Sequence, residues 1–146
     1  MLCWMMPLIG IVLLSATPGS STAYLRCASE SGRTKLAADL QDISGSLERI
    51  TVSIDSASFT LNDEGTATSV IWDPKHEVFT VTVRTHPMKD WNAHRSVEFW
   101  AIPGTWKVEN GGRWSFEGRM RTTDPRPDPS HAIDVIKLHC TLDYSI

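Results

Sequence analysis

Apolar and polar residues alternate along most of the chain after Ile50, and this alternation limits the possible fold more than any other feature. The clearest run is Glu77 to Thr85, in which every second residue from Phe79 to Val83 is apolar. A period of two residues is typical of a strand that buries one face. Turn-forming residues separate the runs, as at positions 110–112. We therefore expect an all-β fold.

The number of alternating runs predicts about seven strands joined by short hairpins, in one antiparallel β-sandwich or one closed meander barrel. One segment near the start favours a short helix instead. Residues Lys35 to Ile43 place Leu36, Leu40 and Ile43 at helical spacing. Ile43 and Leu47 also fit a strand, so both interpretations stay open for this segment.

The hairpin around Asn110–Gly112 has a predictable register. A three-residue turn pairs Val108 with Trp114. It also pairs Trp106 with Phe116, so that these four large apolar side chains share one face. The third residue of such a turn is left-handed, a conformation that a glycine adopts without steric cost.

A second turn is predicted over Asp73–His76, where proline occupies the second position, as type I turns favour. A loop of this length sets Trp72 opposite Glu77. The strand that ends the chain is expected from Ala132 to Tyr144, with Cys140 on its apolar face.

Two cysteines, Cys27 and Cys140, bracket most of the chain, whereas Cys3 lies in a segment that we expect to be removed. In an exported protein such a pair predicts one structural disulfide that joins the first strand to the last. The two Cα atoms should then lie roughly 4.4–6.8 Å apart.

The removed segment is residues 1–23, which read as a signal peptide. The run Leu8–Leu14 is apolar, and Ser21–Ala23 offers small residues at the positions that a signal peptidase reads. No lysine or arginine precedes the apolar run, which departs from the usual pattern. The run is shorter than the roughly 20 residues that span a bilayer, so no stable membrane anchor is expected after cleavage. The sequence therefore predicts one domain, residues 24–146, in the periplasm or outside the cell.

The formal net charge of the chain is −3. This is too weak and has the wrong sign to favour nucleic acid as a partner. No motif for a nucleotide, a phosphate or a bound metal occurs, so no cofactor is expected.

The segment from His86 to Arg95 carries the most chemistry of any predicted loop. His86, Asp90 and His94 are candidate metal ligands, and a mixture of histidine and methionine in such a loop favours copper. The alternative is a solvated hairpin loop without a ligand, because a proline after His86 leaves the side chains without a fixed mutual geometry.

Tryptophan is abundant, and only Trp4 of the six lies in the predicted signal peptide. Trp106 and Trp114 are expected in the core because of the hairpin register. Trp100 lies on the face opposite its apolar neighbours, and Trp91 lies in the loop, so both are candidates for an exposed contact surface. The sequence therefore predicts four ligand-binding residues: Trp91, His94, His86 and Trp100.

Catalytic residues are not predicted. The sequence has no nucleophile elbow and no metalloprotease motif, both cysteines of residues 24–146 are expected in a disulfide, and His131 and His139 are expected to be exposed. The sequence favours a non-catalytic binding module for a protein, a sugar or a small apolar ligand. The rival is a small periplasmic enzyme that uses a metal or two carboxylates, since a carboxylate pair leaves no local signature.

The strand Tyr24–Cys27 near the start and the strand Leu138–Leu142 near the end each carry one cysteine. With the meander of short strands between them, this arrangement resembles small exported bacterial β-meander proteins of unknown function. The resemblance concerns architecture and implies no activity.

Overall fold

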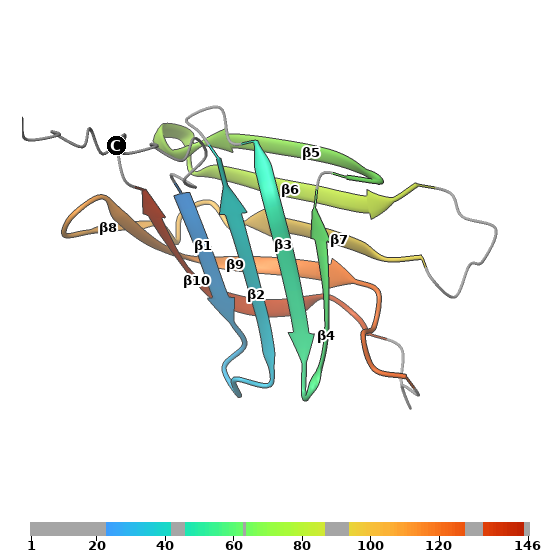
Figure 1. The fold of residues 1–146 in the computed structure, drawn as a ribbon. Helices are drawn as coiled ribbons and strands as arrows, with labels where there is room; N and C mark the ends of the chain where they lie inside the picture. The colour runs from blue at the N-terminus through green and yellow to red at the C-terminus, as the bar shows by residue number, and fades with distance from the viewer. Residues whose placement is uncertain (1–22, 42–45, 63, 87–93, 128–132, 145–146) are drawn as a thin grey trace, which may run out of the picture.

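The computed structural model describes residues 23–41, 46–62, 64–86, 94–127 and 133–144. These residues form ten strands and one short 3-10 helix, η1, and no α-helix occurs among them (Figure 1). The elements are β1 (Ala23–Ala28), β2 (Thr34–Leu40), β3 (Leu47–Ile54), β4 (Ala57–Asn62), β5 (Thr66–Asp73), η1 (Pro74–His76), β6 (Val78–Thr85), β7 (Ser96–Ala101), β8 (Lys107–Glu109), β9 (Arg113–Thr122) and β10 (Ile136–Tyr144).

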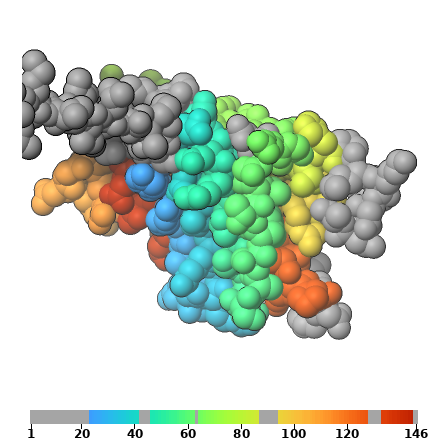
Figure 2. Space-filling model, viewed as in Figure 1, coloured from blue at the N-terminus to red at the C-terminus, as the bar shows by residue number. Residues whose placement is uncertain are grey.

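All ten strands belong to one antiparallel sheet in the order β4-β3-β2-β1-β10-β9-β7-β6-β5, and β8 pairs with β9 outside this path. In Figure 1, β1 to β4 run across the direction of β5, β6 and β7, so the sheet curls over its own inner face. Figure 2 shows β1 to β4 side by side as one layer. The described residues of β4 and β5 form no ladder with each other, which leaves the barrel nearly closed. The all-β prediction is confirmed, but the sheet has more strands than the seven expected.

The helix predicted over Lys35 to Ile43 is wrong, because residues 34–40 form β2. Leu36, Ala38 and Leu40 point into the core, and each is at most 1% exposed. The spacing that suggested a helix also fits alternation, because small Ala38 completes an apolar row between two leucines. Pairing with β1 on one side and β3 on the other decides the outcome.

The predicted disulfide between Cys27 and Cys140 is present, and it closes a separation of 113 residues. The two cysteines lie directly opposite each other in the β1–β10 ladder, with a Cα–Cα distance of 4.1 Å, slightly below the expected range. Both are buried. The disulfide therefore lies inside the barrel at the join between its first and last strands.

Gly118 of β9 is the tightest point of this core. A Cβ added there would lie 2.7 Å from Cζ of Phe99 and 3.2 Å from Sγ of Cys140. Real Cβ atoms do not approach other atoms so closely, and interiors packed this densely have little room to relax. The absent side chain leaves room for the Phe99 ring and the Cys140 sulfur, which both pack on Gly118.

The three-residue turn at positions 110–112 is confirmed. Val108 pairs with Trp114, and the rings of Trp106 and Phe116 stack with centroids 4.2 Å apart. The third turn residue, Gly112, is left-handed at φ +80°. Trp106 and Trp114 are only partly buried against the core, and Val108 is 79% exposed, because the hairpin extends past the end of the barrel (Figure 1).

The predicted register of the β5–β6 hairpin is wrong by two residues. Trp72 lies opposite Phe79 and not opposite Glu77. The turn begins one residue later than predicted, since Pro74 starts η1 and Glu77 closes the loop in a left-handed conformation. A shift by two keeps the same side chains on the inner face, so alternation alone does not distinguish the two registers.

The predicted signal peptide lies outside the described residues except for its last residue, Ala23. Ala23 is the first residue of β1, is fully buried and lies opposite Leu40 and Tyr144. The cleavage site stays a prediction.

Candidate functional site

The loop predicted as the site joins β6 to β7, and residues 87–93, with Trp91 and Asp90, lie outside the described residues. Its ends are described. His86 is exposed, and its backbone N–H donates to the carbonyl of Gly65 at 3.2 Å. His94 is half-buried, and its Nδ1 lies 3.1 Å from Oγ1 of Thr85.

Trp100 lies on the outer face of β7, as predicted, and is half-buried. The guanidinium of Arg121 sits over its ring, 5.5 Å from the centroid. Strands rise roughly 3.3 Å per residue, so Trp100 is about 13 Å along β7 from Ser96, where the strand begins. The structure therefore does not bring Trp100 together with His86 and His94.

A different group of aromatic side chains gathers at the other end of β6, about 26 Å away at the usual rise for a strand of eight residues. Trp72, Trp114 and Tyr144 line a hollow of about 390 Å³, which residues 73–75 complete. The Tyr144 ring lies between the two indoles, with centroids 5.3 Å from Trp72 and 6.4 Å from Trp114. We call this group the aromatic hollow.

Local structure explains why these three rings meet. Each residue lies at or next to an end of its strand: Trp72 in β5, Trp114 in β9 and Tyr144 in β10. The backbone N–H of Tyr144 donates to the carbonyl of Gly112 at 3.2 Å, which fixes the end of β10 against the β8–β9 turn. A Cβ at Gly112 would lie 2.9 Å from the carbonyl oxygen of Tyr144, so a glycine is required here for space as well as for its positive φ.

Polar groups stand at the rim of the aromatic hollow. Lys75 is exposed, and Asp73 is half-exposed with its carboxylate 2.6 Å from Nδ1 of His76. The hydrogen bond from His76 holds the pKa of Asp73 below its usual value. The indole Nε1 of Trp72 is buried and has no hydrogen-bond partner among the described residues.

The sequence prediction missed this hollow. It assigned Trp114 to the core and Trp72 to an ordinary strand position. The available signal was the position of aromatic residues beside predicted turns, but no local pattern shows that the end of β10 meets the β5–β6 turn.

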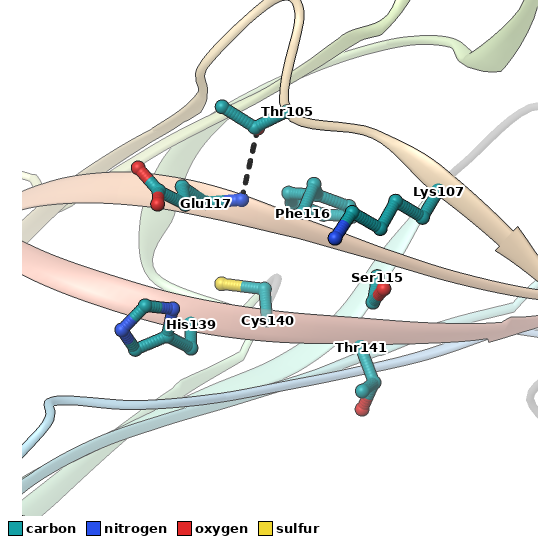
Figure 3. A pocket seen from close by; sticks show the side chains of 8 residues that line it. All are labelled: Thr105, Lys107, Ser115, Phe116, Glu117, His139, Cys140 and Thr141. Atoms are coloured by element: carbon teal, nitrogen blue, oxygen red, sulfur yellow. Dashed lines mark hydrogen bonds between the residues drawn. The ribbon is translucent and has the colours of Figure 1, made fainter.

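A second hollow, of about 520 Å³, lies along the outer face of β9 and β10 beneath the connection from β7 to β8. Figure 3 shows Glu117 and His139 at one end of this second hollow and Lys107, Ser115 and Thr141 at the other. Phe116 and Cys140 also line it. Glu117 lies directly opposite His139 in the ladder. These are the side-chain types that a hydrolase without a metal would use.

The polar side chains of this second hollow do not form a catalytic arrangement. A nucleophile and its base normally lie within hydrogen-bond reach of each other. Figure 3 marks one hydrogen bond among the residues that it draws. The backbone N–H of Glu117 donates this bond to Oγ1 of Thr105 at 3.0 Å. The Glu117 carboxylate instead lies 3.9 Å from the guanidinium of Arg119.

Charged residues form a paired cluster where the β1–β2 and β3–β4 turns approach the segment after β9. Arg126 contacts Asp124 at 2.7 Å and Asp55 at 3.5 Å, and Arg33 contacts Asp55 at 2.7 Å. The hydrogen bond from Arg33 lowers the pKa of Asp55, and that from Arg126 lowers the pKa of Asp124. Because each carboxylate has a guanidinium partner, this cluster serves to tie the turns together.

Within the described ranges, no three histidine, cysteine, aspartate or glutamate side chains lie close enough to hold a metal ion. The set predicted from His86, Asp90 and His94 stays a prediction, because Asp90 is outside those ranges. In the same part of the chain no helix is long and apolar enough to cross a membrane.

Comparisons with protein-family models, with curated proteins and with solved structures find no match to this chain. The resemblance to exported β-meander proteins therefore stays a prediction.

Proposed function

We propose that this protein is a non-catalytic binding module that holds its ligand in the aromatic hollow. The observation that carries the proposal is the meeting of Trp72, Trp114 and Tyr144 around one open space. All three rings are only half-buried, so they keep surface for a ligand. The volume of about 390 Å³ falls within the range of roughly 300–1,000 Å³ that is common for small-molecule sites.

The ligand class that best fits this lining is a neutral sugar. A pyranose ring has an apolar C–H face that packs on an indole or phenol ring, and hydroxyl groups around its edge that need polar partners. Asp73 and Lys75 offer a carboxylate and an ammonium group at the rim. A purely apolar ligand would remove water from the Lys75 ammonium group and from the rim carboxylate at a cost.

Export is part of the proposal. The buried disulfide supports it, because structural disulfides persist in oxidising compartments such as the periplasm and the exterior of the cell. The predicted signal peptide points the same way. A binding module outside the cytoplasm is therefore the function that these observations support best.

Two tryptophan substitutions test the site. We expect a panel of neutral mono- and disaccharides to contain a ligand that changes the intrinsic fluorescence of the purified protein. Trp114→Ala should weaken the binding of that ligand roughly two- to tenfold, since an aromatic contact contributes about 0.5–1.5 kcal/mol. Trp100→Ala is the matched control, because it removes the same side chain from the outer face of β7 and should leave the affinity unchanged.

The opposite pattern of affinities would place the binding site elsewhere on the protein. If Trp100→Ala weakens the ligand and Trp114→Ala does not, then the ligand binds on the β7 side, as the sequence predicted. If no sugar binds to the folded protein, the ligand class is wrong. Circular dichroism of both variants shows whether each keeps the fold.

A further inference from the structure

The outer edge of β5 carries backbone groups that no described strand pairs with, since β5 ends the sheet. The hydrogen bonds of the β5–β6 ladder show which groups these are. The N–H of His86 donates to the carbonyl of Gly65, so this pair is a hydrogen-bonded one. Such pairs alternate in an antiparallel ladder. The N–H and C=O groups that point away from β6 are therefore those of Thr66, Thr68, Val70 and Trp72.

The edge lacks the usual features that prevent strand pairing. Native edges commonly carry lysine, proline or an inward charge that blocks another strand. Residues 66–72 of β5 contain no charged residue and no proline. The short edge strand β8 differs, because it carries Lys107 and Glu109. At the opposite border of the sheet, β4 is also uncharged, and the guanidinium of Arg95 sits 5.8 Å from the ring centroid of its Phe59.

We propose that two copies of this chain pair through β5, antiparallel and around a two-fold axis at Ser69. In this register Thr68 of each copy lies opposite Val70 of the other, and Thr66 lies opposite Trp72. These pairs expose their backbone groups toward each other and form about eight hydrogen bonds between the copies. This inference does not depend on the ligand of the aromatic hollow.

The side chains favour a second copy as the occupant. An exact two-fold brings each residue near the axis against itself or its near neighbours, so any charge there would face a like charge. The uncharged β5 edge avoids this repulsion. The same register sets Ile71, which is 58% exposed, opposite small Ala67 on the outer face. Pairing thus covers an apolar side chain that the single chain leaves in water.

A charge introduced at the axis tests both the surface and the register. Sedimentation equilibrium of the purified protein should show a dimer. Ser69→Lys places two ammonium groups opposite each other and should weaken the dimer at least tenfold, because facing like charges strongly disfavour association. Ser69→Glu alone should do the same. An equal mixture of the two variants should recover the dimer.

Thr82→Lys is the matched control. Thr82 is the cross-strand neighbour of Ser69, is exposed on the same outer face and lies on β6, which is paired on both sides. This variant adds the same charge without touching the edge, so it should stay dimeric. If Ser69→Lys fails to fold, Thr68→Pro replaces it. A proline there removes only an N–H that points outward, which edge strands tolerate, and it should also weaken the dimer.

Several results would overturn the proposal. A monomeric parent protein shows that the edge stays unpaired or awaits a different partner. Open, growing assemblies show a head-to-tail contact and not a two-fold one. A dimer that survives Ser69→Lys and Thr68→Pro uses another surface, and a mixture that fails to recover the dimer shows that Ser69 is not at the axis.

Discussion

The join between β1, β9 and β10 and the border strand β5 differ in how fully their groups are satisfied. At the join, every strand is paired on both sides, and a disulfide links two of them. The Phe99 ring and the Cys140 sulfur both pack closely on Gly118. At the border, Ile71 is exposed and Trp72 is half-buried. Among the described residues, one side of β5 has no partner strand and the indole N–H of Trp72 has no acceptor.

This difference separates stability from binding. Densely packed groups resist change because they have no alternative arrangement, whereas half-satisfied groups gain contacts when a ligand or a second chain arrives. We therefore expect substitutions at the join to lower the free energy of unfolding. Substitutions at the border should change binding or association and leave unfolding nearly unaltered.

Removal of the disulfide gives the largest expected effect on this comparison. The double variant Cys27→Ala, Cys140→Ala should lose about 2–5 kcal/mol of unfolding free energy, because the cross-link no longer restricts the unfolded chain. Urea denaturation measures the loss. Ligand affinity of the still-folded fraction should not change. A variant as stable as the parent would show that the join does not depend on its cross-link.

Gly118→Ala should have the next largest effect. The added methyl group meets the Phe99 ring and the Cys140 sulfur, and overpacking of this kind costs about 1–3 kcal/mol. The same denaturation experiment measures it. Adding Phe99→Leu should recover part of the loss, since a smaller side chain leaves room for the methyl group. If the losses of unfolding free energy from Gly118→Ala and Phe99→Leu simply add, the added methyl group does not clash with the Phe99 ring.

The smallest expected effect is a difference in how Asp124 and Asp73 contribute to the loss of stability in acid. A carboxyl group whose pKa is lowered by folding stabilises the folded state above its unfolded pKa, which is about 4 for aspartate, and this stabilisation is lost as the pH falls through the folded pKa. Asp124 and Asp73 both have lowered pKa values, but the side chain of Asp124 is 12% exposed and that of Asp73 is 47% exposed.

We expect Asp124→Asn to remove more of the acid-dependent loss of stability than Asp73→Asn, because water screens the exposed pair more strongly. Thermal melts between pH 2 and about 7 for the parent and both variants measure this contrast. Equal changes for the two variants would show that the border holds its charges as firmly as the charged cluster after β9 does.

Alternation of side chains predicted the strand class, the inner face of β6 and the partners in the β8–β9 hairpin. It did not predict the helix-or-strand outcome for residues 35–40, because Leu36 and Leu40 fit both periods. It also missed the register of β5 by two residues, since a shift of two leaves Trp72 on the same face. Local patterns thus give the direction of a side chain more reliably than its partner.

The candidate site shows the same limit. The sequence pointed to His86, Trp91 and His94 because one predicted loop combines polar and aromatic chemistry. It pointed to Trp100 because that residue faces away from the apolar side of its strand. The structure separates Trp100 from the two histidines along β7, and it gathers Trp72, Trp114 and Tyr144 from three strands that are distant in the sequence.

By itself the sequence determined the β class, the inward cysteines and the glycine turn, since each depends on neighbours only a few residues away or on a single possible pair. The tertiary structure alone decided which strand ends meet and which edge stays unpaired. Those outcomes depend on the curl of the whole sheet, which brings the last residues of β10 to the β5–β6 turn and leaves β5 without a partner strand among the described residues.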